Sequence, residues 1–127
     1  MGELANGETE AKSFREAIND ALHEEMERDE TVFMMGEDVA VGEGMFAVTK
    51  GLHDQFGEKR MRDTPISEAG FLGAGVGAAA TGTRPVLDMG FITFMGVAFE
   101  QIHNQLTHLR YMFGGELELP MVVRAAE

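Results

Sequence analysis

Apolar residues recur at three- and four-residue steps near the start of the chain, which predicts an amphipathic helix over residues 14–26. Ser13 precedes this stripe and Glu16 stands three residues further on, which is the capping-box pattern of a helix start. The opposite face is mostly charged, so we expect the helix to lie on a surface. The stripe consists of Phe14, Ala17, Ile18, Ala21, Leu22 and Met26.

Four further runs predict strands, and the segments between them predict helices. The strand candidates are TVFMMGED (31–38), RMRDTP (60–65), RPVLDMGFI (84–92) and LPMVVRAA (119–126), the first and last of them buried. The helix candidates are Val48 to Phe56, Glu68 to Thr81 with Ser67 as N-cap and Gly82 at the end, and Phe94 to Met112 before Gly114 and Gly115. This alternation predicts an α/β fold with three layers, a parallel sheet with helices on both faces.

The remaining segment, residues 1–12, is polar and predicts a flexible N-terminal tail. No helix follows the last strand candidate within the 127 residues, which would leave one flank of the sheet uncovered. We therefore expect a truncated product or a domain that another chain completes.

The charge and composition of the chain argue against several classes of partner and of functional site. The chain has 22 acidic and ten basic residues and a formal net charge of −12, which argues against nucleic acid and against an anionic membrane surface as partners. It has no cysteine, so disulfides, thiolate nucleophiles and cysteine-ligated metals are excluded. No signal peptide is visible, and the longest weakly polar stretch, residues 69–80, is too short to span a bilayer. We expect a soluble, cytoplasmic protein.

Glycines in the segment 70–82 invite a nucleotide-binding interpretation, because Gly75, Gly77 and Ala80 fit a loosened G-x-G-x-x-A pattern. That pattern should directly follow a strand and open a helix, whereas these residues lie inside the predicted helix. Close packing of the helix against another backbone is the better account. A nucleotide-binding module stays as an alternative that rests on these glycines alone.

The four histidines offer no constellation for catalysis or metal binding. His103 and His108 lie five residues apart on one predicted helix, which is not the i, i+4 spacing of a metal-binding pair. We expect surface or packing roles for both, and for His23 and His53. No metal site is predicted.

Glu68 attracts attention because it stands directly before a long run of small apolar residues in DTPISEAGFLGAGVGAAATGTRP. An acid in the first turn of a helix is favoured by the helix dipole, by about 0.3–1 kcal/mol, with no functional meaning. A carboxylate retained at the edge of a dry segment could instead serve proton chemistry. The residue pattern alone leaves both interpretations open.

Longer stretches of the chain resemble a known family in order and spacing. FREAINDALHEEMERDETVFMMGEDVA, DTPISEAGFLGAGVGAAATGTRPVLDM, FMGVAFEQIHNQLTHLRYMFGG and LPMVVR are similar to the beta subunit of the decarboxylating component of 2-oxo acid dehydrogenase complexes, of the pyruvate, branched-chain or acetoin type. TPISEAG together with RYMFGG carries most of the specificity. The resemblance implies that residues 13–127 form the N-terminal part of a transketolase-like, thiamine-pyrimidine-binding domain.

The resemblance also implies site residues. The glutamate of the ISE motif, here Glu68, hydrogen-bonds the aminopyrimidine ring of thiamine diphosphate and manages its proton. An aromatic residue stacks on the pyrimidine, and the alignment puts Phe94 there, although a core aromatic at a strand-to-helix junction would look the same. Glu37 and Glu100 match acidic positions connected with a proton relay between active sites.

Partners follow from the same resemblance. The family's metal–diphosphate motif does not occur in this sequence, because the alpha subunit supplies it and would hold the magnesium. A second beta subunit and a lipoyl-bearing acyltransferase core complete the assembly, a heterotetramer bound to its core. The family's beta subunits continue well beyond the VVR motif, so this chain would not be active alone. The implied function is oxidative decarboxylation of a 2-oxo acid with acyl transfer; the alternative is a catalytically incomplete chain that serves assembly only.

Overall fold

The computed structural model describes residues 11–127, and its centre is a sheet of four parallel strands. The strands are β1 (Val32–Gly36), β2 (Met61–Asp63), β3 (Arg84–Phe91) and β4 (Val122–Ala126), in the spatial order β2-β1-β3-β4. All four predicted strands are present, and the predicted parallel α/β arrangement is confirmed. Most of the predicted N-terminal tail, residues 1–12, lies outside the described residues.

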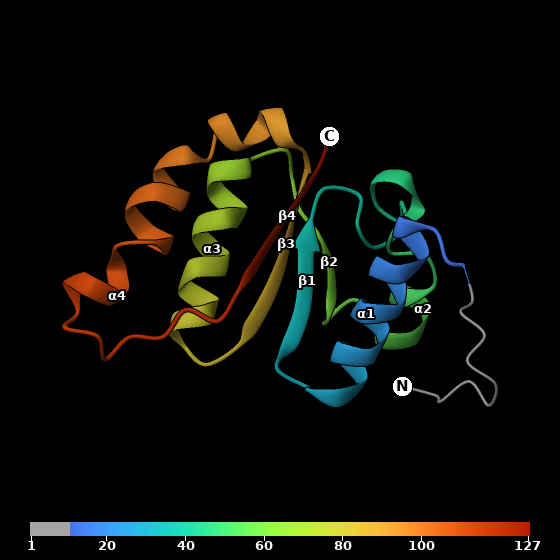
Figure 1. Ribbon diagram of the computed structural model, residues 1–127, viewed down its shortest axis with the longest axis horizontal. Coiled ribbons are helices and arrows are strands. Elements are labelled where there is room, and N and C mark those ends of the chain that lie inside the picture. Colours follow the sequence, from blue (N-terminus) through green and yellow to red (C-terminus); the bar gives the residue numbers. More distant parts are fainter. Residues whose placement is uncertain (1–10) are drawn as a thin grey trace.

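Helices cover both faces of the sheet, as Figure 1 shows. The helices α1 (Phe14–Arg28) and α2 (Leu52–Phe56) lie on one side, and α3 (Glu68–Ala80) lies on the other. Side chains of β1 alternate between the two, because Met34 packs in the cluster with Leu22 and Leu52 whereas Met35 packs against the cluster around Leu72. The sheet therefore separates two hydrophobic cores.

The capping box predicted for α1 is formed. The backbone N–H of Glu16 donates to the Ser13 hydroxyl at 3.3 Å, and the Ser13 N–H donates to the Glu16 carboxylate at 2.8 Å. Leu22 and Met26 are the buried residues of this helix. Asn19 ties α1 to the following loop, because its amide donates to the carbonyl oxygens of Val48 and Lys50.

Close packing against β3 explains Gly75 of α3, whereas Gly77 has open space around it. A Cβ at Gly75 would lie 2.4 Å from Leu87 Cδ1, so only glycine lets the helix approach β3 this closely. The predicted N-cap role of Ser67 is wrong: its backbone adopts φ −163° and ψ 77°, and its side chain makes no capping hydrogen bond. Glu68 nevertheless begins the helix, as expected.

The single helix predicted over residues 94–112 is also wrong. The segment contains a 3₁₀ turn (Ile92–Gly96), a π-helical turn (Gln101–Leu106) and a short helix α4 (Leu109–Met112). Both the Thr107 hydroxyl and the His108 ring bond the carbonyl oxygen of His103, which competes with the regular i→i+4 ladder. The helical spacing of apolar residues is present without one continuous helix.

Two further expectations need adjustment. The loop after β1 contains a short 3₁₀ turn (Met45–Ala47), and α2 starts at Leu52 rather than near Val48. The strand β4 is half-buried to exposed rather than buried, because it pairs with β3 on one side only. In residues 11–127 no helix is long and apolar enough to cross a membrane.

Candidate functional site

Three of the four predicted site residues lie near the carboxyl edge of the sheet, because parallel strands all end at the same edge. Glu37 directly follows β1, and Phe94 lies three residues after the end of β3. Glu68 begins α3, which follows β2 across a four-residue connection. Three segments distant in the sequence therefore bring these side chains to one side of the molecule.

Glu37 and Glu68 form an acidic pair at this edge. Glu68 is only 9% exposed, and one carboxylate oxygen of Glu37, Oε1, is buried without a hydrogen-bond partner among the described residues. Burial, then the nearby charge of Glu68 and that of Asp38, raises the pKa of Glu37. Glu37 is thus a carboxyl group whose neutral form the fold favours, beside a second carboxyl group. Such a pair can hold a proton and exchange it with a ligand.

Phe94 belongs to an aromatic cluster. Its ring meets the Phe91 ring edge-on, with centroids 5.8 Å apart, and Phe91 meets Phe46 in the same way at 6.4 Å. Phe94 remains 36% exposed, so part of its ring is open to a ligand. Phe46 reaches the cluster from the loop after β1 and adopts a left-handed backbone conformation, with φ 61°.

Glu100 stands apart from the acidic pair. It is exposed and accepts a hydrogen bond from the Gln105 amide at 3.2 Å. Within residues 11–127, no hydrogen bond or ion pair connects Glu100 with Glu37 or Glu68. The structure brings three of the four predicted acidic and aromatic site residues to one edge and leaves the fourth on the surface.

The histidine spacing was interpreted for an α-helix, and that interpretation is wrong for His103 and His108. Their rings lie 4.9 Å apart because the π-helical turn puts residues five apart on the same face. The His103 ring also stacks on Phe99, with centroids 5.5 Å apart. Among the described residues, no group of three histidine, aspartate or glutamate side chains could hold a metal ion.

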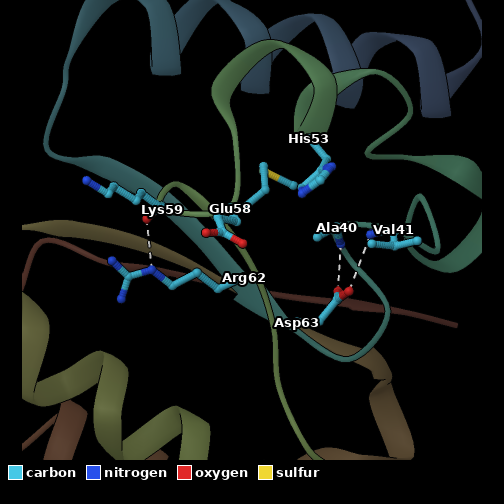
Figure 2. Close-up of a pocket in the computed structure, with 8 residues that line it drawn as sticks. Ala40, Val41, His53, Glu58, Lys59, Arg62 and Asp63 are labelled. Carbon is cyan, nitrogen blue, oxygen red and sulfur yellow. Dashed lines mark hydrogen bonds between the residues drawn. The ribbon is translucent and has the colours of Figure 1, made fainter.

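Two aspartates that sequence reasoning missed organise the loops of this edge. The Asp63 carboxylate accepts hydrogen bonds from the backbone N–H groups of Ala40 and Val41, at 2.7 and 3.3 Å, as Figure 2 shows. Asp88 is 2% exposed and accepts from the Gly90 N–H at 2.9 Å and from Arg124. For Asp88 a sequence signal existed, since an aspartate inside the apolar run RPVLDMGFI needs a partner.

A cleft of about 540 Å³ lies beside β2. Figure 2 shows Asp63 at one wall, His53 at another, and the side chains of Lys59 and Arg62 extending away from Asp63. The Arg62 Nε donates to the Lys59 carbonyl oxygen at 2.8 Å, and its guanidinium lies over the Phe33 ring. Neither Glu37 nor Glu68 lines this cleft, so it is separate from the acidic pair.

A parallel sheet with helices on both faces is the doubly wound α/β arrangement, in which ligands generally bind at the carboxyl ends of the strands. Residues 10–126 match the model of the transketolase pyrimidine-binding domain, and the chain belongs to that family. This assignment also agrees with the fold: a split-gene transketolase, described as an inactive beta4 tetramer, superimposes with a TM-score of 0.66 at 24% identity over 87% of this chain and 33% of that one.

Several sequence relatives within this family are beta subunits of enzymes named for acetoin, pyruvate or 2-oxoisovalerate. The chain is 48% identical to the beta subunit of acetoin:2,6-dichlorophenolindophenol oxidoreductase of Cupriavidus necator, over 89% of this chain and 36% of the relative. It is 48% identical to the mitochondrial pyruvate dehydrogenase E1 beta subunit of Dictyostelium discoideum (91% and 33%) and 46% identical to the 2-oxoisovalerate dehydrogenase beta subunit of Bacillus subtilis (89% and 35%). The chain thus spans about a third of the length of these relatives.

Proposed function

We propose that this chain supplies the pyrimidine-binding side of a thiamine diphosphate site in a 2-oxo acid dehydrogenase. The observation that carries the proposal is the acidic pair Glu37–Glu68 at the carboxyl edge of a transketolase-type pyrimidine-binding domain. The three sequence relatives named above are beta subunits of such dehydrogenases or of an acetoin oxidoreductase, and they support this proposal.

The residues present fit the pyrimidine half of the cofactor. Glu68 offers a largely buried carboxylate for a hydrogen bond to a ring nitrogen, and the partly open ring of Phe94 offers an apolar surface for stacking. The unpartnered Oε1 of Glu37 is a buried polar atom that lacks a donor, which a ligand could provide. When bound, thiamine diphosphate supplies the carbon nucleophile that 2-oxo acid decarboxylation needs.

Proton management is the task of the acidic pair. Glu68 would hold a proton at the pyrimidine nitrogen, and burial together with the nearby charge of Glu68 raises the pKa of Glu37, which favours its neutral form. We assign Glu100, which lies on the surface, to a relay that only an assembled enzyme would complete. We assign the diphosphate and its magnesium to the alpha subunit, because the family's metal–diphosphate motif does not occur in this sequence.

Assembly would involve the alpha subunit, a second beta subunit and a lipoyl-bearing acyltransferase core. The substrate class is a 2-oxo acid such as pyruvate or a branched-chain 2-oxo acid. Relatives named for acetoin, pyruvate and 2-oxoisovalerate are 48%, 48% and 46% identical, so identity does not favour one of these substrates.

A catalytically incomplete assembly module is the second candidate, and one observation favours it. Large apolar side chains stand exposed along residues 91–113, which we call the apolar segment. Exposed apolar surface of this kind marks a protein interface. Its exposed members are Phe91, Ile92, Phe94, Val97, Phe99, Tyr111, Met112 and Phe113.

Substitution of Glu68 by glutamine in the assembled alpha–beta component separates the two candidates. Glutamine keeps a hydrogen bond to the pyrimidine but cannot transfer the proton, so we expect turnover to fall by about 100-fold or more. Exposed Glu116 gives a matched control, Glu116→Gln, which should leave turnover unchanged. Undiminished thiamine-dependent turnover in Glu68→Gln would contradict the catalytic assignment.

A further inference from the structure

The strand β3 contains an irregularity immediately before the aromatic cluster. Asp88 pairs with Arg124 of β4 and Phe91 pairs with Ala126, so Met89 and Gly90 together lie opposite the single residue Ala125. Gly90 has φ +68°, a left-handed conformation that favours glycine. This is a β-bulge, and bulges change the direction of the side chains that follow them.

Asp88 holds this bulge from inside the sheet. One carboxylate oxygen, Oδ1, accepts from the Gly90 N–H at 2.9 Å, and the other, Oδ2, pairs with the Arg124 guanidinium on β4. The side chain of Asp88 is 2% exposed and that of Arg124 is 16% exposed. A buried carboxylate with both oxygens engaged has one well-defined position.

The neighbouring strand leaves room for this arrangement. Gly36 of β1 pairs with Asp88, and a Cβ at Gly36 would lie 2.6 Å from the Asp88 carbonyl oxygen and 3.1 Å from its Cβ. Any larger residue at this position would displace the Asp88 backbone. Glu37 follows Gly36 directly, so the Asp88 anchor also adjoins one member of the acidic pair.

We infer that Asp88 is a positioning residue: through Arg124 and the Gly90 N–H it fixes the bulge that sets the direction of Phe91 and Phe94. The edge-on contact of these two rings, at 5.8 Å, is the geometry that the bulge maintains. The expected effect of Asp88 on a pyrimidine stacked on Phe94 rests on the proposed function. Its effect on the arrangement of the Phe91 and Phe94 rings does not. Asp88 itself need not touch a ligand.

Nuclear magnetic resonance of the 127-residue chain, labelled at its nine phenylalanines, tests the inference. In the wild type we expect nuclear Overhauser contacts between the ring protons of Phe91 and Phe94. In Asp88→Ala these contacts should disappear. In the complex with the alpha subunit, the Kd for thiamine diphosphate with magnesium should rise about tenfold in the variant, the size expected for losing one charge-assisted contact that orders the site.

Asp29→Ala is the matched control. Like Asp88, Asp29 pairs with an arginine of the sheet: its partner is Arg84, at 3.0 Å, at the end of β3 opposite to Asp88. The variant Asp29→Ala should leave the ring contacts unchanged even where it lowers the stability of the chain. Persistence of the Phe91–Phe94 contacts in folded Asp88→Ala, or their equal loss in Asp29→Ala, would overturn the inference.

Gly90→Ala provides the second test if Asp88→Ala does not fold. An alanine Cβ would meet only ordinary contacts, 3.6 Å from Met45 Cε and 3.7 Å from Phe94 Cδ2, so its effect comes from the left-handed backbone. Loss of the ring contacts supports the inference, and their retention overturns it. The ring contacts are measured without a ligand and decide the role of Asp88. The proposed function is tested separately, because a wild type that binds no thiamine diphosphate even together with the alpha subunit would contradict it.

Discussion

The two sides of the sheet differ in how completely they bury their apolar residues. On the side of α1 and α2, the cluster around Met26, Met34, Leu52 and Met61 is almost entirely buried. On the side of α3, the core around Leu72 and Leu87 is equally dry, but the apolar segment next to it is exposed. The first side buries this cluster but leaves Phe14 of α1 83% exposed, whereas the second presents a longer run of exposed apolar residues that we expect a partner to cover.

Backbone regularity follows the same division. The α1 side carries a capped 15-residue helix, whereas residues 92–112 form 3₁₀, π and α turns in succession. Regular, capped elements derive stability from local and core contacts, while irregular segments with few buried contacts open at lower free-energy cost. The scaffold and the candidate binding region are therefore distinct parts of this chain.

Replacing one methionine by alanine on each side of the sheet should give the largest difference in the free energy of unfolding. Met34 is fully buried in β1, and Met34→Ala should destabilise the chain by about 2–5 kcal/mol through lost burial and a cavity. Met112, at 70% exposure in the apolar segment, provides the same chemical change, and Met112→Ala should stay within about 0.5 kcal/mol. Urea unfolding followed by circular dichroism measures both; equal losses would remove the distinction between the sides.

Replacing the serine before each long helix should give the next largest difference in stability. The Ser13 hydroxyl accepts the Glu16 N–H, so Ser13→Ala should cost about 1 kcal/mol, whereas Ser67 caps nothing and Ser67→Ala should cost little. Thermal unfolding of the two variants checks this prediction. A larger loss at Ser67 than at Ser13 would mean that the start of α3 is capped after all.

Glutamine at position 37 should change stability in a pH-dependent way. Burial and the charge of Glu68 raise the pKa of Glu37 above its ordinary value of 4.5. The folded chain then holds the proton more tightly than the unfolded chain, so stability falls as the pH rises from the ordinary value through the folded-state pKa. We expect Glu37→Gln to be more stable than the wild type at neutral pH and equal to it below about pH 4.

The background Glu68→Gln supplies the control for that experiment. Without the charge of Glu68, ionising Glu37 in the folded chain costs less free energy. The stability gained by Glu37→Gln should therefore be smaller in the Glu68→Gln background. An undiminished gain would show that the charge of Glu68 does not act on Glu37 and that burial and Asp38 account for the raised pKa. Unfolding free energies measured from pH 4 to pH 8 provide the comparison.

Surface substitutions in the apolar segment should affect stability least. Val97 and Phe113 are 63% and 61% exposed, so the double variant Val97→Ser/Phe113→Ser should unfold within about 0.5 kcal/mol of the wild type. The same variant should associate less with itself or with a partner subunit, as sedimentation velocity would measure. Unchanged association would show that this segment is not the interface.

Much of the scaffold could be predicted from the sequence, because its signals are local. The spacing of apolar residues predicted α1, and the pair Ser13 and Glu16 predicted its cap. Alternating runs predicted the four strands and the parallel sheet. The family resemblance agrees with the match to the transketolase pyrimidine-binding domain.

The misses depend on side-chain contacts that spacing does not encode. The π-helical turn arises where Thr107 and His108 both bond the His103 carbonyl oxygen, so the helical period of residues 94–112 was misleading. The role of Asp88 depends on Arg124, which lies 36 residues further along the chain and reaches it only through strand pairing. The nearness of Glu37 and Glu68 likewise requires the folded sheet. The functional roles of Glu37, Glu68, Phe94 and Glu100 stay predictions.

Calorimetric titration with thiamine diphosphate and magnesium is the most direct measurement, made on the chain alone and on the chain together with the alpha subunit. We predict binding that requires the alpha subunit and weakens when Phe94 is replaced by alanine, because the pyrimidine and the diphosphate are held by different subunits. A stable complex of the two chains that binds no thiamine diphosphate would contradict the account and leave the assembly module as the better description.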